Sequence, residues 1–304
     1  MSVSVVVLAA GKGTRMKSDL PKVLHEVAGK PILHHVLETS FSLDAIQKIV
    51  VLGHEAEQIK QKSSHYEVEW GLQKEQKGTG HAVQTVFSLI HTQAQHVLIL
   101  SGDVPLISTA TLTRLLKVAS PHNIALVTTQ PDNPYGLGRI MRDTNNTITG
   151  IIEEKDASDV QKEVSEVNAG IYCIPKHLLE KYLPMLNAQN EQGEYYLTDI
   201  VAQAVKDDIP IEAIHACPLE VQGVNNREQL AELGRAYSRQ IATQLMRDGV
   251  TLHDPSRFDV RGSLSAGTDV EIDINVVIEG TVILEDDVKI GPNCILKNCT
   301  VGSG

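Results

Sequence analysis

The chain has 304 residues, of which 42% are hydrophobic and 21% charged. This length and composition allow about two folded domains and argue against a disordered chain. The formal net charge of −11 disfavours a nucleic-acid partner, because binding to a phosphate backbone needs a broad basic face. The apolar run Val5–Ala10 follows no basic segment and is too short to span a membrane, so we expect a soluble, cytoplasmic protein without a membrane partner.

Short apolar runs alternate with segments of helical spacing in the first part of the chain. The runs lie at residues 3–8, 48–52, 96–100 and 124–127. Between them, apolar residues recur three and four positions apart, as at Ile32, Val36 and Leu37. This alternation predicts an α/β, Rossmann-like domain with a mostly parallel sheet covered on both faces. Ligands of such sheets collect at the carboxyl ends of the strands.

The loop after the first run, Leu8–Met16, carries two glycines between a strand and a helix. Such a turn exposes backbone N–H groups to a phosphate. It lacks the third glycine of a dinucleotide fingerprint and the G-K-[ST] of a P-loop, but it contains Arg15, with Lys22 seven residues later. The small residues Ala9 and Ala10 allow a flat base close to the backbone. We interpret this loop as a nucleotide-binding loop; a tight turn with exposed basic side chains is the alternative.

Asp103 follows the apolar run at 96–100, so its carboxylate should lie at the edge of the sheet where the strands end. Mg²⁺ prefers oxygen ligands, keeps several waters, and is usually held by one or two protein groups together with substrate phosphates. Asp103 is therefore a candidate Mg²⁺ ligand. A turn residue before Pro105 is the alternative.

A helix is predicted over residues 228–249, where five apolar residues recur at three- and four-residue spacing. Asn226 can cap its start and Gly249 can end it. From residue 258 onward, pairs of apolar residues recur every six residues. The pairs are Phe258/Val260, Leu264/Ala266, Val270/Ile272, Val276/Ile278, Val282/Leu284, Val288/Ile290 and Cys294/Leu296. This regularity predicts a left-handed parallel β-helix rather than irregular hairpins. Because the repeat stops at residue 304 without a polar cap, we expect a chain truncated early in that β-helix.

Several motifs together resemble one enzyme family, the nucleoside-triphosphate:sugar-phosphate nucleotidylyltransferases, and within it the bacterial N-acetylglucosamine-1-phosphate uridylyltransferases. The motifs are Leu8–Met16 followed by Pro21–Lys22, Gln73–His81, Ser101–Pro105, Tyr135–Arg139, Glu166–Gly170 and Gly223–Asn226. The resemblance covers essentially the whole chain. It implies a nucleotidylyltransferase domain at 1–227, a linker helix at 228–249 and the start of a hexapeptide-repeat β-helix at 250–304.

The resemblance also implies roles for individual residues. Arg15, Lys22 and Asp103 would be catalytic, and Asp103 with Asn225 would hold Mg²⁺. Uridine recognition would fall to Gln73, Gly78 and Thr79, and sugar recognition to Gly138, Glu153, Asn168 and Asn225. The remaining nucleotide contacts would come from Leu8, Ala9, Ala10, Gly11, Ser101 and Gly102. His81 and the segment Glu194–Asp199 receive no role from the sequence.

The implied reaction transfers a uridylyl group from UTP to N-acetylglucosamine 1-phosphate, giving UDP-N-acetylglucosamine and pyrophosphate with Mg²⁺. Full-length relatives are homotrimers that also acetylate glucosamine 1-phosphate on later coils of the β-helix, and we expect that site to be absent here. A glucose-1-phosphate nucleotidylyltransferase that uses UTP, dTTP or ATP is the nearest alternative. A non-catalytic scaffold subunit is a more distant one, because the phosphate- and metal-binding residues are retained.

Overall fold

The computed structural model describes residues 2–304. The chain folds as two compact units. The first contains the residues up to Val23 together with Leu33–Gly223, and the second contains Leu24–Ile32 together with Val224–Gly304. The segment 24–32 thus joins the second unit, although it lies inside the sequence range 1–227.

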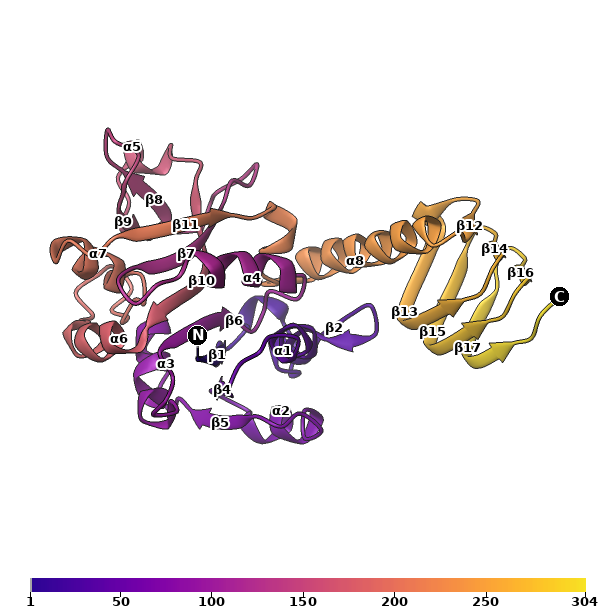
Figure 1. Cartoon of the computed structure of the whole chain (residues 1–304), viewed down its shortest axis with the longest axis horizontal. Coiled ribbons are helices and arrows are strands. Elements are labelled where there is room, and N and C mark those ends of the chain that lie inside the picture. The colour runs from indigo at the N-terminus through magenta and orange to yellow at the C-terminus, as the bar shows by residue number, and fades with distance from the viewer. Residues whose placement is uncertain (1) are drawn as a thin grey trace. The chain divides into compact units, whose positions relative to one another are not determined.

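The first unit is built on a nine-stranded sheet with the central order β11-β7-β10-β6-β1-β4-β5 (Figure 1). The strands are β1 (Val3–Ala9), β4 (Gln47–Leu52), β5 (Glu69–Leu72), β6 (His96–Ser101), β7 (Ile124–Thr129), β8 (Arg139–Arg142), β9 (Ile148–Ile152), β10 (Val167–Pro175) and β11 (Ile211–His215). β1 pairs in parallel with β4 and β6, whereas β10 runs antiparallel to its neighbours β6 and β7. The expected Rossmann-like, mostly parallel sheet is confirmed.

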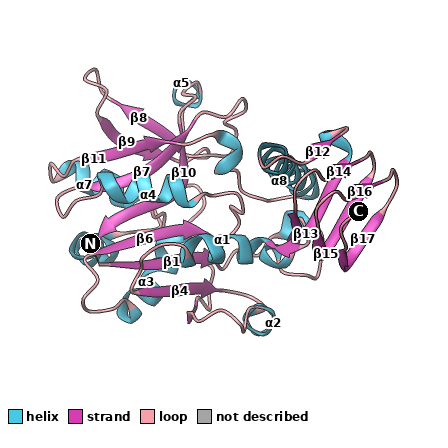
Figure 2. Ribbon diagram, turned by 45° about the vertical axis from the view of Figure 1, so that its right-hand side comes forward, coloured by secondary structure: helices cyan, strands magenta, loops and turns pink. Residues whose placement is uncertain are grey.

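Helices cover this sheet, as Figure 2 shows in cyan. They are α1 (Ile32–Phe41), α2 (Ala56–Lys62), α3 (Thr79–Val86), α4 (Thr109–Val118), α5 (Asp159–Lys162), α6 (Lys176–Tyr182) and α7 (Asp199–Lys206), with short 3₁₀ turns at Thr14–Met16, Lys22–Leu24, Phe87–Leu89, Leu183–Met185 and Pro218–Glu220. α3 packs against β1, β4 and β5, and α4 packs against β7, β10 and β11. Val6, Val51 and Val83 are fully buried in the core that joins α3 to the sheet.

The carboxyl ends of the parallel strands meet at one edge of the sheet. Leu8 of β1 lies opposite Ser101 of β6, and Ala9 lies opposite Leu52 of β4. The backbone N–H of Gly102 donates to the carbonyl of Leu8 at 2.9 Å, and a Cβ at Gly102 would lie 2.9 Å from that same oxygen. Glycine at 102 therefore allows the loop after β6 to lie directly against the end of β1.

The second unit combines one long helix with short parallel strands. α8 (Arg227–Arg247) lies close to the predicted range 228–249, and the Asn226 side chain caps it by accepting a hydrogen bond from the Gln229 N–H at 2.8 Å. The other elements are the hairpin β2 (Glu26–Val27) and β3 (Lys30–Pro31), then β12 (Thr251–Leu252), a 3₁₀ turn at Pro255–Arg257, β13 (Phe258–Ala266), β14 (Glu271–Ile272), β15 (Val276–Leu284), β16 (Lys289–Ile290) and β17 (Ile295–Val301).

The strands after α8 form two three-stranded parallel sheets, β12-β14-β16 and β13-β15-β17, which Figures 1 and 2 show side by side. Phe258 of β13 lies opposite Val276 of β15, eighteen residues later, so three hexads separate paired residues. Val260, Ile278 and Val282 are fully buried, which confirms that the predicted hexad positions face the core. None of the helices within residues 2–304 is both long enough and apolar enough to cross a membrane.

Candidate active site

The loop after β1 folds back on the segment that carries Lys22. Gly13 has φ +61°, a left-handed backbone conformation that glycine adopts at little steric cost. A Cβ at this position would lie 2.6 Å from the Cβ of Lys22. Met16, which is buried, anchors the loop, and Arg15 beside it is exposed. The sequence therefore brings one buried anchor and two cations, Arg15 and Lys22, to the end of β1.

Lys22 forms an ion pair with Asp103, the residue just beyond β6. The two side chains are only 11% and 19% exposed. The hydroxyl of Ser101 donates to the other carboxylate oxygen of Asp103 at 2.6 Å. Burial by itself would raise the pKa of Asp103, but the charge of Lys22 and the hydrogen bonds from Lys22 and Ser101 outweigh it and hold that pKa below its usual value. Asp103 is therefore an anion that Lys22 neutralises.

The surroundings of Asp103 are suited to a metal ion that takes few protein ligands. Among residues 2–304, no group of three or more His, Cys, Asp or Glu side chains could hold a metal ion. A Cβ at Gly223 would lie 3.5 Å from the Asp103 carboxylate, so the segment 223–226 begins beside it. A hard cation with mostly water and phosphate ligands needs little more than such a carboxylate.

Gln73, which follows β5, is 2% exposed and has a fixed amide. Its Nε2 lies 3.0 Å from the carbonyl oxygen of Gly78, to which it donates, and 3.0 Å from Nδ1 of His81. With the amide nitrogen used in this way, the Oε1 atom is the group that remains to accept a hydrogen bond from a ligand. The sequence assigned His81 no role, because its contact with Gln73 depends on the conformation of the loop between them.

The segment Glu194–Asp199, to which the sequence also assigned no role, forms hydrogen bonds with the loop at 77–80. Tyr195 donates its N–H to the carbonyl of Lys77 and accepts from the N–H of Gly80, both at 2.8 Å. The Leu197 N–H donates to the hydroxyl of Thr79 at 3.1 Å. Gly78 has φ +103°, and a Cβ there would lie 2.6 Å from the Tyr195 carbonyl oxygen. Gly78 and Thr79 are thus held by a segment more than a hundred residues away.

The same segment reaches a second group of predicted residues. The Thr198 hydroxyl donates to Glu153 Oε1 at 3.0 Å. A Cβ at Gly138 would lie 3.4 Å from the other oxygen of Glu153, and the Asn168 N–H donates to the Gly138 carbonyl at 2.8 Å. The structure therefore brings Gly138, Glu153 and Asn168 together, with Thr198 beside them.

The side chains of this second group are held by hydrogen bonds. Asn168 donates from Nδ2 to the hydroxyl of buried Tyr172 at 2.6 Å, and its Oδ1 accepts from the Gly170 N–H at 3.2 Å. Burial raises the pKa of Glu153, which the hydrogen bond from Thr198 partly offsets. Thr198 and Tyr172 carry no sequence signal of their own.

The loop before β8 is closed by Arg139, whose side chain is 2% exposed. Arg139 forms an ion pair with Glu154 at 2.7 Å and donates to the carbonyl of Leu137. Glu154 also accepts from the Gly136 N–H at 3.2 Å. This arrangement fixes the backbone around Gly138. Asn225, the remaining predicted site residue, belongs to the second unit.

Comparisons with known proteins agree with this fold. Residues 5–206 match the MobA-like NTP transferase domain. The chain is 50% identical over 305 residues to the bifunctional protein GlmU of Stutzerimonas stutzeri and 48% identical to that of Acinetobacter baylyi. Each match covers 100% of this chain and 67% of the relative.

Solved structures show the same fold at lower identity. A UDP-glucose pyrophosphorylase complexed with UDP-glucose superposes with a TM-score of 0.63 at 18% identity, covering 79% of this chain and 100% of that one. A putative glucose-1-phosphate thymidylyltransferase from Bacillus anthracis gives 0.61 at 16% identity, covering 77% and 94%. The chain therefore belongs to the GlmU family and is a nucleotidyltransferase.

Proposed function

We propose that this chain transfers a uridylyl group from UTP to N-acetylglucosamine 1-phosphate, releasing pyrophosphate and forming UDP-N-acetylglucosamine. Two observations carry the proposal. The first unit contains the basic loop with Lys22, the buried amide of Gln73 and the polar group around Glu153, and the chain matches GlmU relatives. We infer that Arg15, Lys22 and Asp103 are the catalytic residues.

The substrate divides among three groups of residues. The backbone at Leu8–Gly11 and at Ser101–Gly102 would lie against the nucleotide, since these segments meet at the end of β1. Gln73 would accept from the N3–H of uracil through Oε1, which supports a preference for uracil, with Gly78 and Thr79 shaping the loop. Gly138, Glu153 and Asn168 would bind the sugar, since a carboxylate and an amide suit hydroxyl groups and the Gly138 N–H suits the N-acetyl carbonyl.

The chemistry is an in-line displacement at the α-phosphorus of UTP. An oxygen of the sugar 1-phosphate forms the new P–O bond while the bond to pyrophosphate breaks. The attacking phosphate is already an anion, so no general base is required. Lys22 and Arg15 would orient the phosphates and neutralise charge on the leaving pyrophosphate, which is where such enzymes gain most of their rate.

A divalent cation is typical of this family, and Mg²⁺ is the ion we propose. Asp103 would be its charged protein ligand and Asn225 its second ligand, and when bound Mg²⁺ would neutralise phosphate charge. Asn225 lies in the second unit, so its pairing with Asp103 stays a prediction.

The test is the release of pyrophosphate from UTP, Mg²⁺ and N-acetylglucosamine 1-phosphate, measured beside glucose 1-phosphate with UTP, dTTP or ATP. We expect the first combination to exceed the others in kcat/KM by at least about a hundredfold, because a missing N-acetyl group leaves buried polar groups of the site unpaired. A higher kcat/KM with glucose 1-phosphate would assign the chain to the alternative substrate class. Failure with every sugar phosphate would favour a scaffold subunit.

Further proposals concern the organisation of the chain. We propose a nucleotidylyltransferase domain at 1–227, a linker helix at 228–249 and the beginning of a left-handed parallel β-helix at 250–304. The pairing of β13 with β15 at a spacing of eighteen residues supports the β-helix. Assembly as a homotrimer and a cytoplasmic location also stay predictions.

A further inference from the structure

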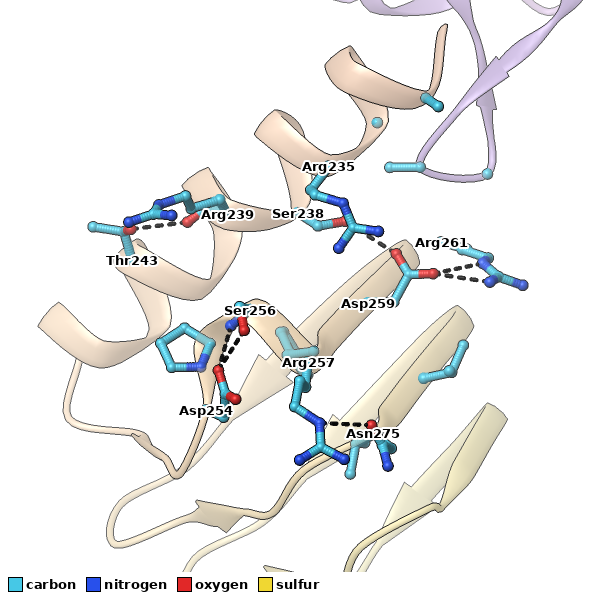
Figure 3. Close-up of a pocket in the computed structure, with 18 of the residues that line it drawn as sticks. Arg235, Ser238, Arg239, Thr243, Asp254, Ser256, Arg257, Asp259, Arg261 and Asn275 are labelled. Atoms are coloured by element: carbon cyan, nitrogen blue, oxygen red, sulfur yellow. Dashed lines mark hydrogen bonds and ion pairs between the residues drawn. The ribbon is translucent and has the colours of Figure 1, made fainter. Parts of the chain in front are cut away.

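The second unit contains a pocket of about 1010 Å³. Its walls are α8, the 3₁₀ turn at Pro255–Arg257, the start of β13 and the tip of the β2–β3 hairpin (Figure 3). Ala28 and Gly29 form that tip with positive φ angles, and a Cβ at Gly29 would lie 2.8 Å from the backbone of Arg261. Every lining residue belongs to the second unit, whereas the proposed catalytic residues Lys22 and Asp103 belong to the first.

Arginine is concentrated in this pocket. The second unit carries nine basic and thirteen acidic side chains, so its net charge is −4. Five of its six arginines nevertheless line the pocket, together with only three acidic residues. These arginines are Arg227, Arg235, Arg239, Arg257 and Arg261. The pocket is therefore a basic site within an acidic unit.

Two of the acidic residues in the pocket already have partners. Asp259 accepts hydrogen bonds from Arg261 at 2.9 Å and from the Ser238 hydroxyl at 3.1 Å. Asp254 accepts from the N–H and the hydroxyl of Ser256, which lower the pKa of Asp254. Arg261 therefore neutralises Asp259, whereas Asp254 keeps its charge and interacts electrostatically with Arg257.

Three arginines of the pocket form no direct ion pair in the part of the chain that the structure describes. Arg235 and Arg239 lie four positions apart on α8, and therefore on one face of that helix, and neither forms an ion pair within residues 2–304. The Arg257 side chain donates to the neutral side-chain oxygen of Asn275 at 3.0 Å, and its charge also interacts with the nearby Asp254 carboxylate. Figure 3 shows Arg235 projecting from α8 towards β13, with Arg257 on the turn below it.

We propose that this pocket binds a phosphate-bearing small molecule. A guanidinium group presents a planar fork of N–H donors that matches phosphate oxygens, and neighbouring arginines favour a ligand with more than one negative charge. The pocket volume lies at the upper end of the range of about 300–1000 Å³ for small-molecule sites. Leu230 and Phe258 add apolar walls, which leave room for an organic group next to the phosphates.

The test is calorimetric titration of the full chain with inorganic tripolyphosphate in EDTA at low salt. The double variant Arg235→Gln/Arg257→Gln should bind the probe about a hundredfold more weakly than the wild type at this site, with about tenfold lost per charge-assisted hydrogen bond. Arg247→Gln is the matched control, because Arg247 lies on the same helix but does not line the pocket. It should bind the probe as the wild type does.

A second pair of measurements separates this site from the proposed catalytic loop. The variant Arg15→Gln/Lys22→Gln should keep the Arg235-dependent binding, whatever reaction the first unit performs. ATP in EDTA should bind more tightly than tripolyphosphate if the apolar walls contact an organic group, and equally if only phosphate is recognised. Unchanged binding in Arg235→Gln/Arg257→Gln, or an equal loss in Arg247→Gln, would overturn the proposal.

Discussion

Replacing Lys22 by methionine tests how the ion pair with Asp103 is used. The substitution keeps most of the side-chain volume and removes the charge. Removing one partner from a wholly buried ion pair costs about 3–5 kcal/mol, and since Asp103 keeps some contact with solvent we expect a loss of about 1–2 kcal/mol in the free energy of unfolding without ligands. Turnover should fall as well, because Lys22 no longer neutralises phosphate charge.

The same substitution should increase the affinity for a divalent cation in the absence of nucleotide. In the wild type such a cation competes with Lys22 for the Asp103 carboxylate. Two unit charges 4 Å apart interact by about 4 kcal/mol at an effective dielectric constant of 20, and about 1.4 kcal/mol of this already corresponds to a tenfold change. We therefore expect Mn²⁺, used in place of Mg²⁺ for its spectroscopic signal, to bind at least about tenfold more tightly to Lys22→Met.

The assay is electron paramagnetic resonance of free Mn²⁺ during titration, supported by thermal unfolding. Lys17→Met is the control, because Lys17 is an exposed cation five residues before Lys22 and its loss makes the same change in net charge. It should leave both the affinity and the stability near the wild-type values. If Lys22→Met binds Mn²⁺ no more tightly than Lys17→Met, Lys22 does not compete for the metal-binding carboxylate, and the assignment of Asp103 loses its support.

Three further substitutions address separate parts of the site. Asp103→Ala should lower kcat by about a hundredfold or more while the fold persists, and near-normal turnover with Mg²⁺ would remove Asp103 from the metal site. Thr198→Val removes a hydrogen bond that favours the ionised form of Glu153, so the pKa of Glu153 should rise further. As the pH is lowered, KM for the sugar phosphate should therefore begin to increase at a higher pH in the variant than in the wild type. Profiles of KM against pH check this. Because its pKa is raised on folding, Glu153 stabilises the fold at low pH, and this contribution is lost as the pH rises through the folded-state pKa. The loss should be larger in Thr198→Val. Thermal unfolding measured across pH checks this. His81→Ala should raise KM for UTP several-fold with little change in KM for the sugar phosphate, since the His81 ring lies in hydrogen-bond distance of the Gln73 amide. Unchanged kinetics would mean that the amide is fixed without His81.

Local periodicity explains how much of the fold could be predicted. The β-branched run at 3–8 and the hexads after 258 contain their structural signal within a few residues, and both appear as strands at the expected positions. Asp103 could be predicted as a site residue on similar grounds, because it lies two residues after the buried strand β6. What it contacts depends on pairing between distant strands.

Two features could not be predicted because their partners lie far away in sequence. The hairpin 24–32 has a short turn with positive φ at Ala28 and Gly29, but its membership of the second unit follows from its packing against Arg261. The segment 194–199 meets the loop at 77–80 through backbone groups, as in the bond from Leu197 to Thr79 across 118 residues. Backbone donors leave no trace in side-chain composition, so no pattern in the sequence indicates these contacts.

The segment 194–199 forms hydrogen bonds both with the proposed uridine-binding loop at 77–80 and with Glu153 of the proposed sugar site. A displacement of this segment at one of the two should therefore also change the other. Gly78→Ala places a Cβ 2.6 Å from the Tyr195 carbonyl oxygen at φ +103°, which should push the segment away and carry Thr198 with it, off Glu153. KM should therefore rise for both UTP and the sugar phosphate. Gly193→Ala is the control, because Gly193 also has a positive φ, +65°, but a Cβ there has nothing within 4 Å. That control costs about 1 kcal/mol of backbone strain and should leave both KM values near normal. A rise in KM for UTP alone in Gly78→Ala would show that the two parts of the site respond independently.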